Sequence, residues 1–422
     1  MKILHLSTGD SKGAFFGAYR THTNLKKHGH ESSMCVLEKT SQDTDVYEIA
    51  HSKRRMFSLF GRIMRRFFVR RGGPEDKIYL IYHTTFSIRE IFKRYTQKPD
   101  LIIVYFVADY LSDHDLFEIQ KHYGCPIAFY LMDAAMFTGG CHYPWHCEGY
   151  KVDCNNCPAM KYPHLIKLPK YIFHKRKKYY MQMDCFFLSA SKWLDDRCEA
   201  SGIKAKLGIK KAIIGIDEQV FKPREKIEAN SVINVKIPSG NRVIFLGAQS
   251  LSDPRKGVKY VLDALKFIKQ SFPELLSNVS ILTVGDQVQA SLPEGISFVN
   301  IAFIHDKDKY PYLYNLADGF ICPSIEDAGP MMINEALMSG IPVIAFKVGV
   351  AEDLIVERIS GFLADNITTQ ALANSIIEFL RLDEHSLVAV KESSRQLALQ
   401  RCTSQCQVND IESLVYNKSV SA

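Results

Sequence analysis

The stretch CPSIEDAGPMMINEALMSGIPVIAF, residues 322–346, decides the fold of the second half of the chain. It continues a short apolar run, 319–322, that predicts a buried strand. A proline in the first turn of a helix loses no needed N–H group, so Gly329–Pro330 indicates a helix start. We expect a helix over 331–338 and an apolar strand over 341–346. This order of elements indicates an α/β domain.

Two carboxylates flank the start of this helix. Asp327 lies in the loop before it, and Glu335 follows after seven intervening residues, inside the helix. A helix N-terminus offers N–H groups and a positive dipole end, which suit a phosphate. A carboxylate further along can accept two hydrogen bonds from a ribose diol. A solvated acidic loop before an ordinary helix also fits this composition, because exposed acids are common.

This stretch resembles the E-x7-E region of the retaining glycosyltransferases of family four, which have the GT-B fold. In that family the second Glu binds the ribose of the nucleotide-sugar, and the resemblance gives this role to Glu335. The first acid lies near the transferred sugar, which implies catalytic roles for Asp327 and its neighbour Glu326. Gly329, at the helix start, is a further candidate for donor binding.

Length and composition predict a cytoplasmic protein of two domains. The 422 residues exceed one typical domain, and an apolar content of 46% is ample for two cores. The net charge of +7 is mild and no nucleic-acid motif accompanies it, so we expect no nucleic-acid partner. The 11 cysteines of so long a chain do not indicate a small disulfide scaffold. The N-terminus lacks a signal-peptide pattern, and the longest apolar run, 101–108, is too short to span a bilayer.

The first half of the chain alternates strands and helices. The apolar runs 3–6, 101–106 and 127–131 predict strands of a buried parallel sheet, and 113–123 predicts a helix that Asp113 caps.

A glycine-rich loop, TGDSKGAFFG at 8–17, follows the first strand and precedes a helix over 18–27. Its backbone could approach an anion or a sugar, and a plain strand–helix turn fits equally. The loop resembles the first loop of the same family, which implies donor binding at Gly13.

Residues 132–158, MDAAMFTGGCHYPWHCEGYKVDCNNCP, follow the carboxyl end of a predicted strand, where open α/β sheets place their sites. The spacing C-x5-C-x6-C-x2-C suits a tetrahedral structural zinc site, with His142 and His146 as alternative ligands. Reduced buried thiols or a disulfide also fit. The four cysteines are Cys141, Cys147, Cys154 and Cys157.

This segment resembles a subgroup of the same family that carries TGGCHY and a Cys-rich run after the fourth strand. There the strand ends in His-Asp, and the histidine lies beside the reacting sugar. This sequence has Met132 and Asp133 instead, and methionine cannot donate that hydrogen bond. The resemblance implies a catalytic role for Asp133, and it leaves open whether the aspartate suffices, another residue substitutes or activity is reduced.

Two basic runs stand out. The first basic run, 51–73, holds eight Lys or Arg and no acid, with aromatic and aliphatic residues at helical spacing. Such a helix can lie on an anionic membrane, where each cation contributes roughly 1 kcal/mol, or it can pack its apolar stripe on its own domain. The second basic run, 161–180, could extend this surface, and an ordinary solvated helix face fits too.

The loop GAQSLSDPRKG, 247–257, lies between a predicted strand over 242–246 and a helix from Val258. Arg255 and Lys256 at this junction could neutralise a diphosphate, and an ordinary surface pair also fits. The family has an Arg several residues before a Lys-Gly pair, and both contact the donor diphosphate. The resemblance gives this role to Lys256, with Arg255 in place of the missing earlier arginine.

The resemblance implies a GT-B fold, with two Rossmann-like domains facing a cleft. The expected parts are an acceptor-binding domain over 1–218 with a Cys-rich insert at 138–158, a linker over 219–240, a nucleotide-sugar-binding domain over 241–395 and a helix over 396–422 that crosses back to the first domain.

The implied activity is transfer of a hexose, with retention, from a nucleotide-sugar to a saccharide acceptor, which we expect to be lipid-linked. The setting would be surface polysaccharide synthesis in the cytoplasm, with peripheral contact to the inner face of the membrane through 51–73. No cofactor is expected for catalysis, because charged side chains and helix N–H groups would stabilise the leaving group. The alternative is a non-catalytic nucleotide-sugar-binding or polysaccharide-assembly scaffold, which Met132 favours.

Overall fold

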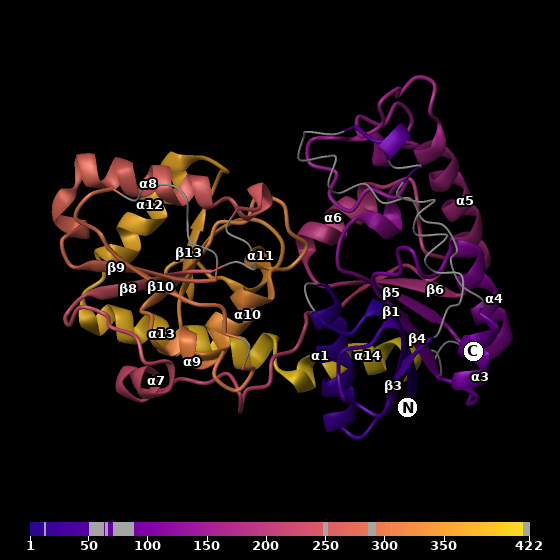
Figure 1. The fold of residues 1–422 in the computed structure, drawn as a ribbon, viewed down its shortest axis with the longest axis horizontal. Helices are drawn as coiled ribbons and strands as arrows, with labels where there is room; N and C mark the ends of the chain where they lie inside the picture. The colour runs from indigo at the N-terminus through magenta and orange to yellow at the C-terminus, as the bar shows by residue number, and fades with distance from the viewer. Residues whose placement is uncertain are drawn as a thin grey trace. The chain divides into compact units, whose positions relative to one another are not determined.

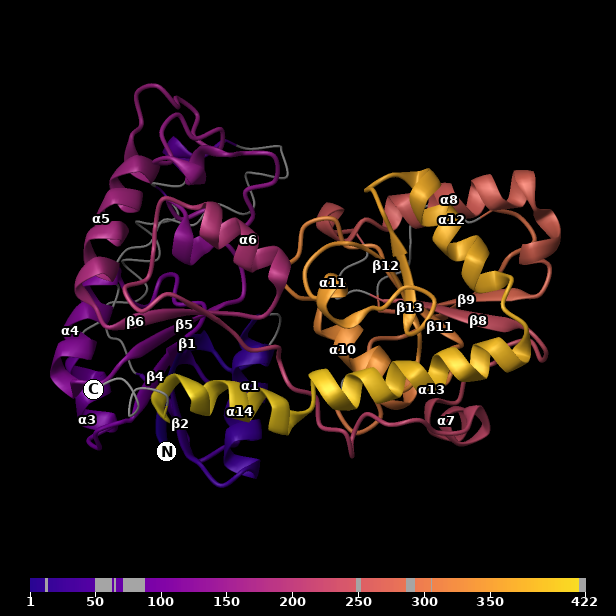
Figure 2. The same cartoon turned by 180° about the vertical axis from the view of Figure 1, so that it is seen from behind.

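The structure is a computed structural model that describes residues 1–11, 14–49, 63, 66–70, 88–247, 252–285, 293–304 and 306–416. Gly13 and most of the first basic run lie outside these described residues. The chain divides into two compact units, and Figures 1 and 2 show the elements of each. The first unit comprises residues 1–213 and 407–422, and the second comprises residues 214–406.

The first unit is built on a parallel sheet whose described strands run in the order β3-β2-β1-β4-β5-β6-β7. Every residue of β4, β5 and β6 is buried, as in sheets that helices cover on both faces. The strands are β1 (Lys2–Gly9), β2 (Glu31–Glu38), β3 (Val46–Glu48), β4 (Leu101–Val104), β5 (Ile127–Leu131), β6 (Cys185–Ser189) and β7 (Ile209–Lys211). The helices are α1 (Ala14–Lys27), α3 (Arg89–Arg94), α4 (Asp113–Tyr123), η2 (Ala135–Phe137), η3 (Gly149–Lys151), α5 (Leu168–Gln182) and α6 (Lys192–Ala200).

The last helix of the chain, α14 (Ser404–Tyr416), docks on the first unit through a buried glutamine. The Gln407 amide accepts from Asn24 at 2.8 Å and donates to Thr21 at 2.9 Å and to Tyr130 at 3.1 Å. Because buried polar groups must be paired, these bonds fix α14 against α1 and β5.

The second unit has a parallel sheet in the order β10-β9-β8-β11-β12-β13. Helix α13 packs on α10, and α12 packs on α8 (Figure 2). The strands are β8 (Arg242–Leu246), β9 (Val279–Val284), β10 (Ser297–Ile301), β11 (Gly319–Cys322), β12 (Val343–Phe346) and β13 (Gly361–Ala364). The helices are α7 (Lys226–Ile233), η4 (Pro254–Lys256), α8 (Val258–Ser271), η5 (Pro273–Leu276), α9 (Tyr312–Asn315), α10 (Met331–Met338), α11 (Ala351–Leu354), α12 (Thr369–Leu380) and α13 (Glu384–Arg401). The α/β prediction with two Rossmann-like sheets is confirmed.

The chain leaves the first sheet earlier than the sequence pattern predicts. The apolar run over 211–215 predicts the last strand of the first domain, but the strand there, β7, ends at Lys211, and the division between the units falls after residue 213. Ala212 still belongs to the first unit, where its N–H donates to the Ser189 carbonyl at 2.8 Å, whereas Ile214 belongs to the second unit, where its carbonyl accepts from the Asn334 amide at 2.9 Å.

Two further local predictions are corrected. Ser112, and not Asp113, caps α4, because the Ser112 hydroxyl accepts from the Asp115 N–H while the Asp115 carboxylate accepts from Ser112. The predicted linker contains helix α7, which the second unit holds through a 2.6 Å ion pair between Lys226 and Asp318.

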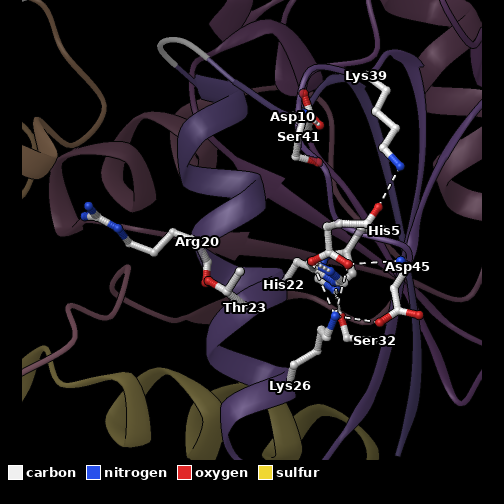
Figure 3. Close-up of polar contacts among 11 residues, drawn as sticks. His5, Asp10, Arg20, His22, Thr23, Lys26, Ser32, Lys39, Ser41 and Asp45 are labelled. Atoms are coloured by element: carbon white, nitrogen blue, oxygen red, sulfur yellow. Dashed lines mark hydrogen bonds and ion pairs between the residues drawn. The ribbon is translucent and has the colours of Figure 1, made fainter. Parts of the chain in front are cut away.

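A polar network is buried inside the first unit between β1, β2 and α1. Ser32 lies 2.9 Å from the Nε2 of His5 and 2.7 Å from the Nδ1 of His22, and Figure 3 shows the three side chains meeting. His22 continues to Asp43 at 3.3 Å, which pairs with Lys26 at 3.1 Å. Burial holds the pKa of His5 well below its usual range and lowers that of His22 to about 4, so both rings are neutral at pH 7.

Candidate functional site

The loop from β11 to α10 carries the first pair of candidate acids, and both are buried. Glu326 and Asp327 are 3% and 9% exposed, and Glu335 inside α10 is 3% exposed. The interpretation of a solvated acidic loop is therefore wrong. Buried carboxylates need partners, because an unpaired buried charge costs several kcal/mol.

Two glycine turns pack directly on this loop. Gly257 has φ +63°, and a Cβ there would lie 2.0 Å from the Pro323 carbonyl oxygen. Gly349 has φ +59°, and a Cβ there would lie 2.6 Å from the Asp327 carbonyl oxygen. Only glycine permits both the backbone conformation and the close approach. The 3-10 turn η4 is thereby placed against the start of α10.

Lys256 and Asp327 form an ion pair within this cluster. Their side chains are 20% and 12% exposed. Burial acts to lower the pKa of Lys256, but the charge of Asp327 and its hydrogen bond outweigh burial and raise it. Two residues predicted to contact the same donor are thus brought together, and here they neutralise each other.

Arg255 does not point to the same partner. Its guanidinium pairs with Asp253 at 2.6 Å, and the Asp253 carboxylate also accepts from the Arg255 backbone N–H at 3.0 Å. Gly329 donates its N–H to the Asp327 carboxylate at 3.2 Å, which shapes the turn into α10.

Glu335 accepts a hydrogen bond from Tyr314, a pairing that the sequence did not predict. The hydroxyl of Tyr314, a fully buried residue of α9, donates to Glu335 Oε2 at 2.6 Å. The segment 314–318 resembles the family region that leads to the nucleotide-base pocket, but the sequence does not reveal that Tyr314 has a partner 21 residues away.

In the first unit, Asp133 lies just after β5 and binds a histidine. The Asp133 Oδ2 lies 2.5 Å from the Nδ1 of His142, and its Oδ1 accepts from the Ala135 N–H at 2.7 Å. His142 stacks on Phe106 with ring centroids 4.9 Å apart. A small cavity beside this pair is lined in part by Met132 and Asp133.

The loop that carries the histidine closes on itself and is fixed by a buried arginine. The Ala134 N–H donates to the His142 carbonyl at 2.9 Å. Arg176, which is 1% exposed, donates to Asp113 at 3.1 Å and to the Thr138 carbonyl at 2.8 Å. Arg176 belongs to the second basic run, where a membrane or solvent-facing role was expected. The structure instead places it in the core beneath the candidate site.

The four cysteines of the insert are free thiols that lie near one another. Burial, followed by the neighbouring thiols, raises the pKa of Cys141, and burial raises that of Cys154 to about 12. Cys141 donates to the Tyr143 carbonyl at 3.1 Å. Across the described residues, no three His, Cys, Asp or Glu side chains are grouped to hold a metal. Structural zinc therefore stays a prediction.

The predicted site residues fall in separate units. Lys256, Asp327 and Glu335 belong to the second unit, Asp133 belongs to the first, and Gly13 lies outside the described residues. Among the described helices, none is both long and apolar enough to cross a membrane.

Comparison with known proteins shows a family match in the second unit and a shared fold over the whole chain. Residues 240–381, which lie in the second unit, match the family model described as glycosyl transferases group 1. Two solved structures share the fold over the whole chain. Sucrose-phosphate synthase from Thermosynechococcus elongatus has a TM-score of 0.66 at 14% identity and covers 100% of both chains. Anabaena Alr3699/HepE in complex with UDP and glucose has a TM-score of 0.62 at 17% identity and covers 99% of both. The fold is that of the GT-B glycosyltransferases.

Curated relatives match over shorter spans. D-inositol 3-phosphate glycosyltransferase of Segniliparus rotundus is 26% identical over 181 residues, which cover 40% of this chain and 38% of that protein. Lipopolysaccharide 1,2-N-acetylglucosaminetransferase of Salmonella typhimurium is 27% identical over 157 residues, covering 33% and 40%. Phosphatidyl-myo-inositol mannosyltransferase of Mycobacterium leprae is 29% identical over 149 residues, covering 34% and 38%. The chain thus spans about two fifths of the length of the curated relatives it matches.

Proposed function

We propose that this protein is a retaining glycosyltransferase that moves a sugar from a nucleotide-sugar donor to a saccharide acceptor. The observation that carries the proposal is the ion pair between Lys256 and the buried Asp327 just before α10, the helix that carries the buried Glu335, within the unit that the family model matches. Buried carboxylates lose their hydration and therefore need cations or hydrogen-bond donors as partners. Charged groups of both signs beside a helix N-terminus suit a nucleoside diphosphate.

Each candidate site residue of the second unit has a distinct proposed role. Lys256 and the N-terminal N–H groups of α10 would hold the diphosphate, and Glu335 would accept hydrogen bonds from the ribose. Asp327 and Glu326 would lie beside the transferred sugar. Arg255 would have to leave Asp253 to reach the diphosphate, so we assign it a smaller share of donor binding.

The reaction needs no redox partner. The bond between the anomeric carbon and a diphosphate oxygen breaks, and a bond from that carbon to the acceptor oxygen forms on the same face. The acceptor proton passes to the departing diphosphate oxygen. Catalysis would come from stabilising the negative charge of that leaving group, which fixed donors do well in a buried site.

On the acceptor side, Asp133 and His142 are the proposed pair. Met132 stands where the family has a histidine before the aspartate. In this protein His142, further along the chain, places an imidazole beside the same Asp133 carboxylate. The Asp133 carboxylate would fix the histidine so that it can contact an acceptor hydroxyl or the sugar. Met132→His would then raise activity only slightly, whereas His142→Ala would reduce it strongly.

We also propose that the acceptor is lipid-linked and that the protein works at an anionic membrane surface in polysaccharide assembly. The names of two curated relatives refer to lipopolysaccharide and phosphatidyl-myo-inositol. In this chain, the Lys161 ammonium donates to the Arg66 carbonyl at 2.6 Å and so joins the two basic runs. Phe67, Tyr162 and Leu165 in these runs are 64%, 60% and 80% exposed.

Vesicle sedimentation tests the membrane part. We expect binding to vesicles that contain phosphatidylglycerol, weaker binding to pure phosphatidylcholine and a marked loss with Leu165→Glu. Equal binding of the variant would count against this surface.

A donor-turnover assay tests the enzymatic proposal. Wild-type protein should hydrolyse or transfer from at least one nucleotide-sugar, and Glu335→Ala should abolish this, while Glu274→Ala, which removes an exposed carboxylate of the same unit, should not. Binding of the donor without any turnover would instead support a non-catalytic scaffold, the second candidate, which the methionine at position 132 favours.

A further inference from the structure

The hydrogen bond between Tyr314 and Glu335 joins two residues that solvent barely reaches. Tyr314 is 0% exposed and Glu335 is 3% exposed, and the donor and acceptor oxygens lie 2.6 Å apart. Hydrogen bonds to an ionised carboxylate are short and about twice as strong as neutral ones. The orientation of the carboxylate is therefore tied to the position of one hydroxyl group.

That hydroxyl is itself held in place by aromatic rings. Phe245 of β8 and Phe320 of β11 meet the Tyr314 ring edge to face at centroid distances of 5.6 and 5.9 Å, and Phe221 does so at 6.0 Å. Edge-to-face packing against three rings leaves the tyrosine ring little freedom to rotate. The sheet of the second unit thus sets the direction of the hydroxyl.

The tyrosine acts as a permanent donor. Burial, together with the neighbouring charge of Glu335, raises the pKa of Tyr314 well above its usual range, so the phenol keeps its proton. Tyr310 contributes a second hydroxyl, 3.3 Å from that of Tyr314. An ionised carboxylate has about four lone-pair sites, so Glu335 can accept from Tyr314 and still accept from a diol.

We infer that Tyr314 is a positioning residue for nucleoside recognition. Its hydroxyl orients the Glu335 carboxylate so that both ribose hydroxyls can donate to it, and the site thereby selects ribonucleoside diphosphates over their 2′-deoxy counterparts. The inference rests on the proposed function, since it concerns the same donor site. It assigns the selectivity to a residue that does not itself touch the nucleotide.

The size of the effect follows from the bonds concerned. A deoxynucleoside leaves the oriented carboxylate without one of two donors, so wild-type protein should bind it at least about tenfold more weakly. In Tyr314→Phe the carboxylate can turn toward the single remaining hydroxyl, so the ribo-to-deoxy ratio should fall to about threefold or less. Affinity for the deoxy form should change little.

The test is calorimetric titration of the full chain with UDP, GDP and ADP, followed by the 2′-deoxy counterpart of the tightest binder. Tyr310→Phe is the matched control, because it removes a neighbouring phenol hydroxyl and leaves the Glu335 contact intact. The control should keep the wild-type ratio. A general loosening of the fold would weaken both nucleotides equally and would leave the ratio unchanged.

The outcomes are distinguishable. A wild-type protein that binds ribo and deoxy forms equally, or a Tyr314→Phe protein that keeps the wild-type ratio, overturns the inference while leaving the proposed function intact. Failure of every nucleotide to bind wild-type protein overturns the proposed function itself. If Tyr314→Phe does not fold, Phe221→Leu removes one of the rings that hold the tyrosine, and a smaller fall of the ratio is expected, whereas an unchanged ratio would overturn the inference.

Discussion

The ion pair between Lys256 and Asp327 allows a test in which two substitutions break the same contact and have opposite effects on ligand binding. Lys256→Met removes the cation proposed to hold the donor diphosphate. Asp327→Asn removes the carboxylate that forms an ion pair with this lysine in the structure. Both variants lose the pair, so any difference between them in binding reports on the lysine rather than on the fold.

The magnitudes follow from the burial of the pair. Exposed pairs contribute about 0–1 kcal/mol, and breaking a fully buried pair costs about 3–5 kcal/mol. Since the two side chains are 20% and 12% exposed, we expect each variant to lose about 2 kcal/mol of unfolding free energy. A hydrogen bond from a charged donor contributes about 1.5–3 kcal/mol, so Lys256→Met should weaken diphosphate binding by about tenfold to a hundredfold.

Asp327→Asn should bind nucleoside diphosphate about threefold to tenfold more tightly than wild-type protein, because its lysine no longer has a competing carboxylate. Its sugar-transfer rate should nevertheless fall, since Asp327 is a proposed catalytic residue. Calorimetric titration gives the affinities, and thermal unfolding confirms that both variants are folded and similarly destabilised. Equal weakening of binding in the two variants would refute the reasoning and would make the pair a structural contact only.

Three further outcomes are expected in the first unit. Burial lowers the pKa of His22 to about 4, so below about pH 6.5 the unfolded chain binds more protons than the folded protein. The free energy of unfolding should therefore fall by about 2 kcal/mol between pH 6.5 and pH 5. In urea unfolding, His22→Gln should reduce this pH dependence, and an unchanged pH dependence would contradict the prediction. Arg176→Met leaves the Asp113 carboxylate buried without its partner and should cost about 3–5 kcal/mol, whereas Lys178→Met on the exposed face of α5 should leave the melting temperature unchanged. If zinc is structural, elemental analysis should find about one equivalent per chain and Cys154→Ser should lower the melting temperature; a metal-free protein with normal stability would make the zinc prediction wrong.

The sequence predicted most accurately the helices and strands whose ends are set by neighbouring residues in the chain. The bounds of β5, β8, β11, α4 and α10 follow from apolar runs that end at glycine, proline or capping residues. The predictions were wrong where contacts between residues distant in the sequence decide the end of a helix or strand. Strand β7 ends at Lys211 and the units divide after residue 213, although the apolar run continues to Ile216, and no local pattern reveals this.

The candidate site shows the same division. The resemblance to family four, more than residue types and spacing, made Lys256, Asp327, Glu335 and Asp133 candidates, and it gives no information on which of them pair. The hydrogen bond between Tyr314 and Glu335 depends on how α9 and α10 pack on one sheet, so the sequence alone does not predict it.

The most direct test of the central claim is a crystal structure of the protein with the nucleoside diphosphate that binds it most tightly. The account predicts a diphosphate oxygen within about 3.2 Å of Lys256 Nζ and ribose hydroxyls at the same distance from the Glu335 carboxylate, with Asp327 released from the lysine. A nucleotide bound elsewhere, with Lys256 still paired to Asp327 and no ligand contact to Glu335, would contradict it.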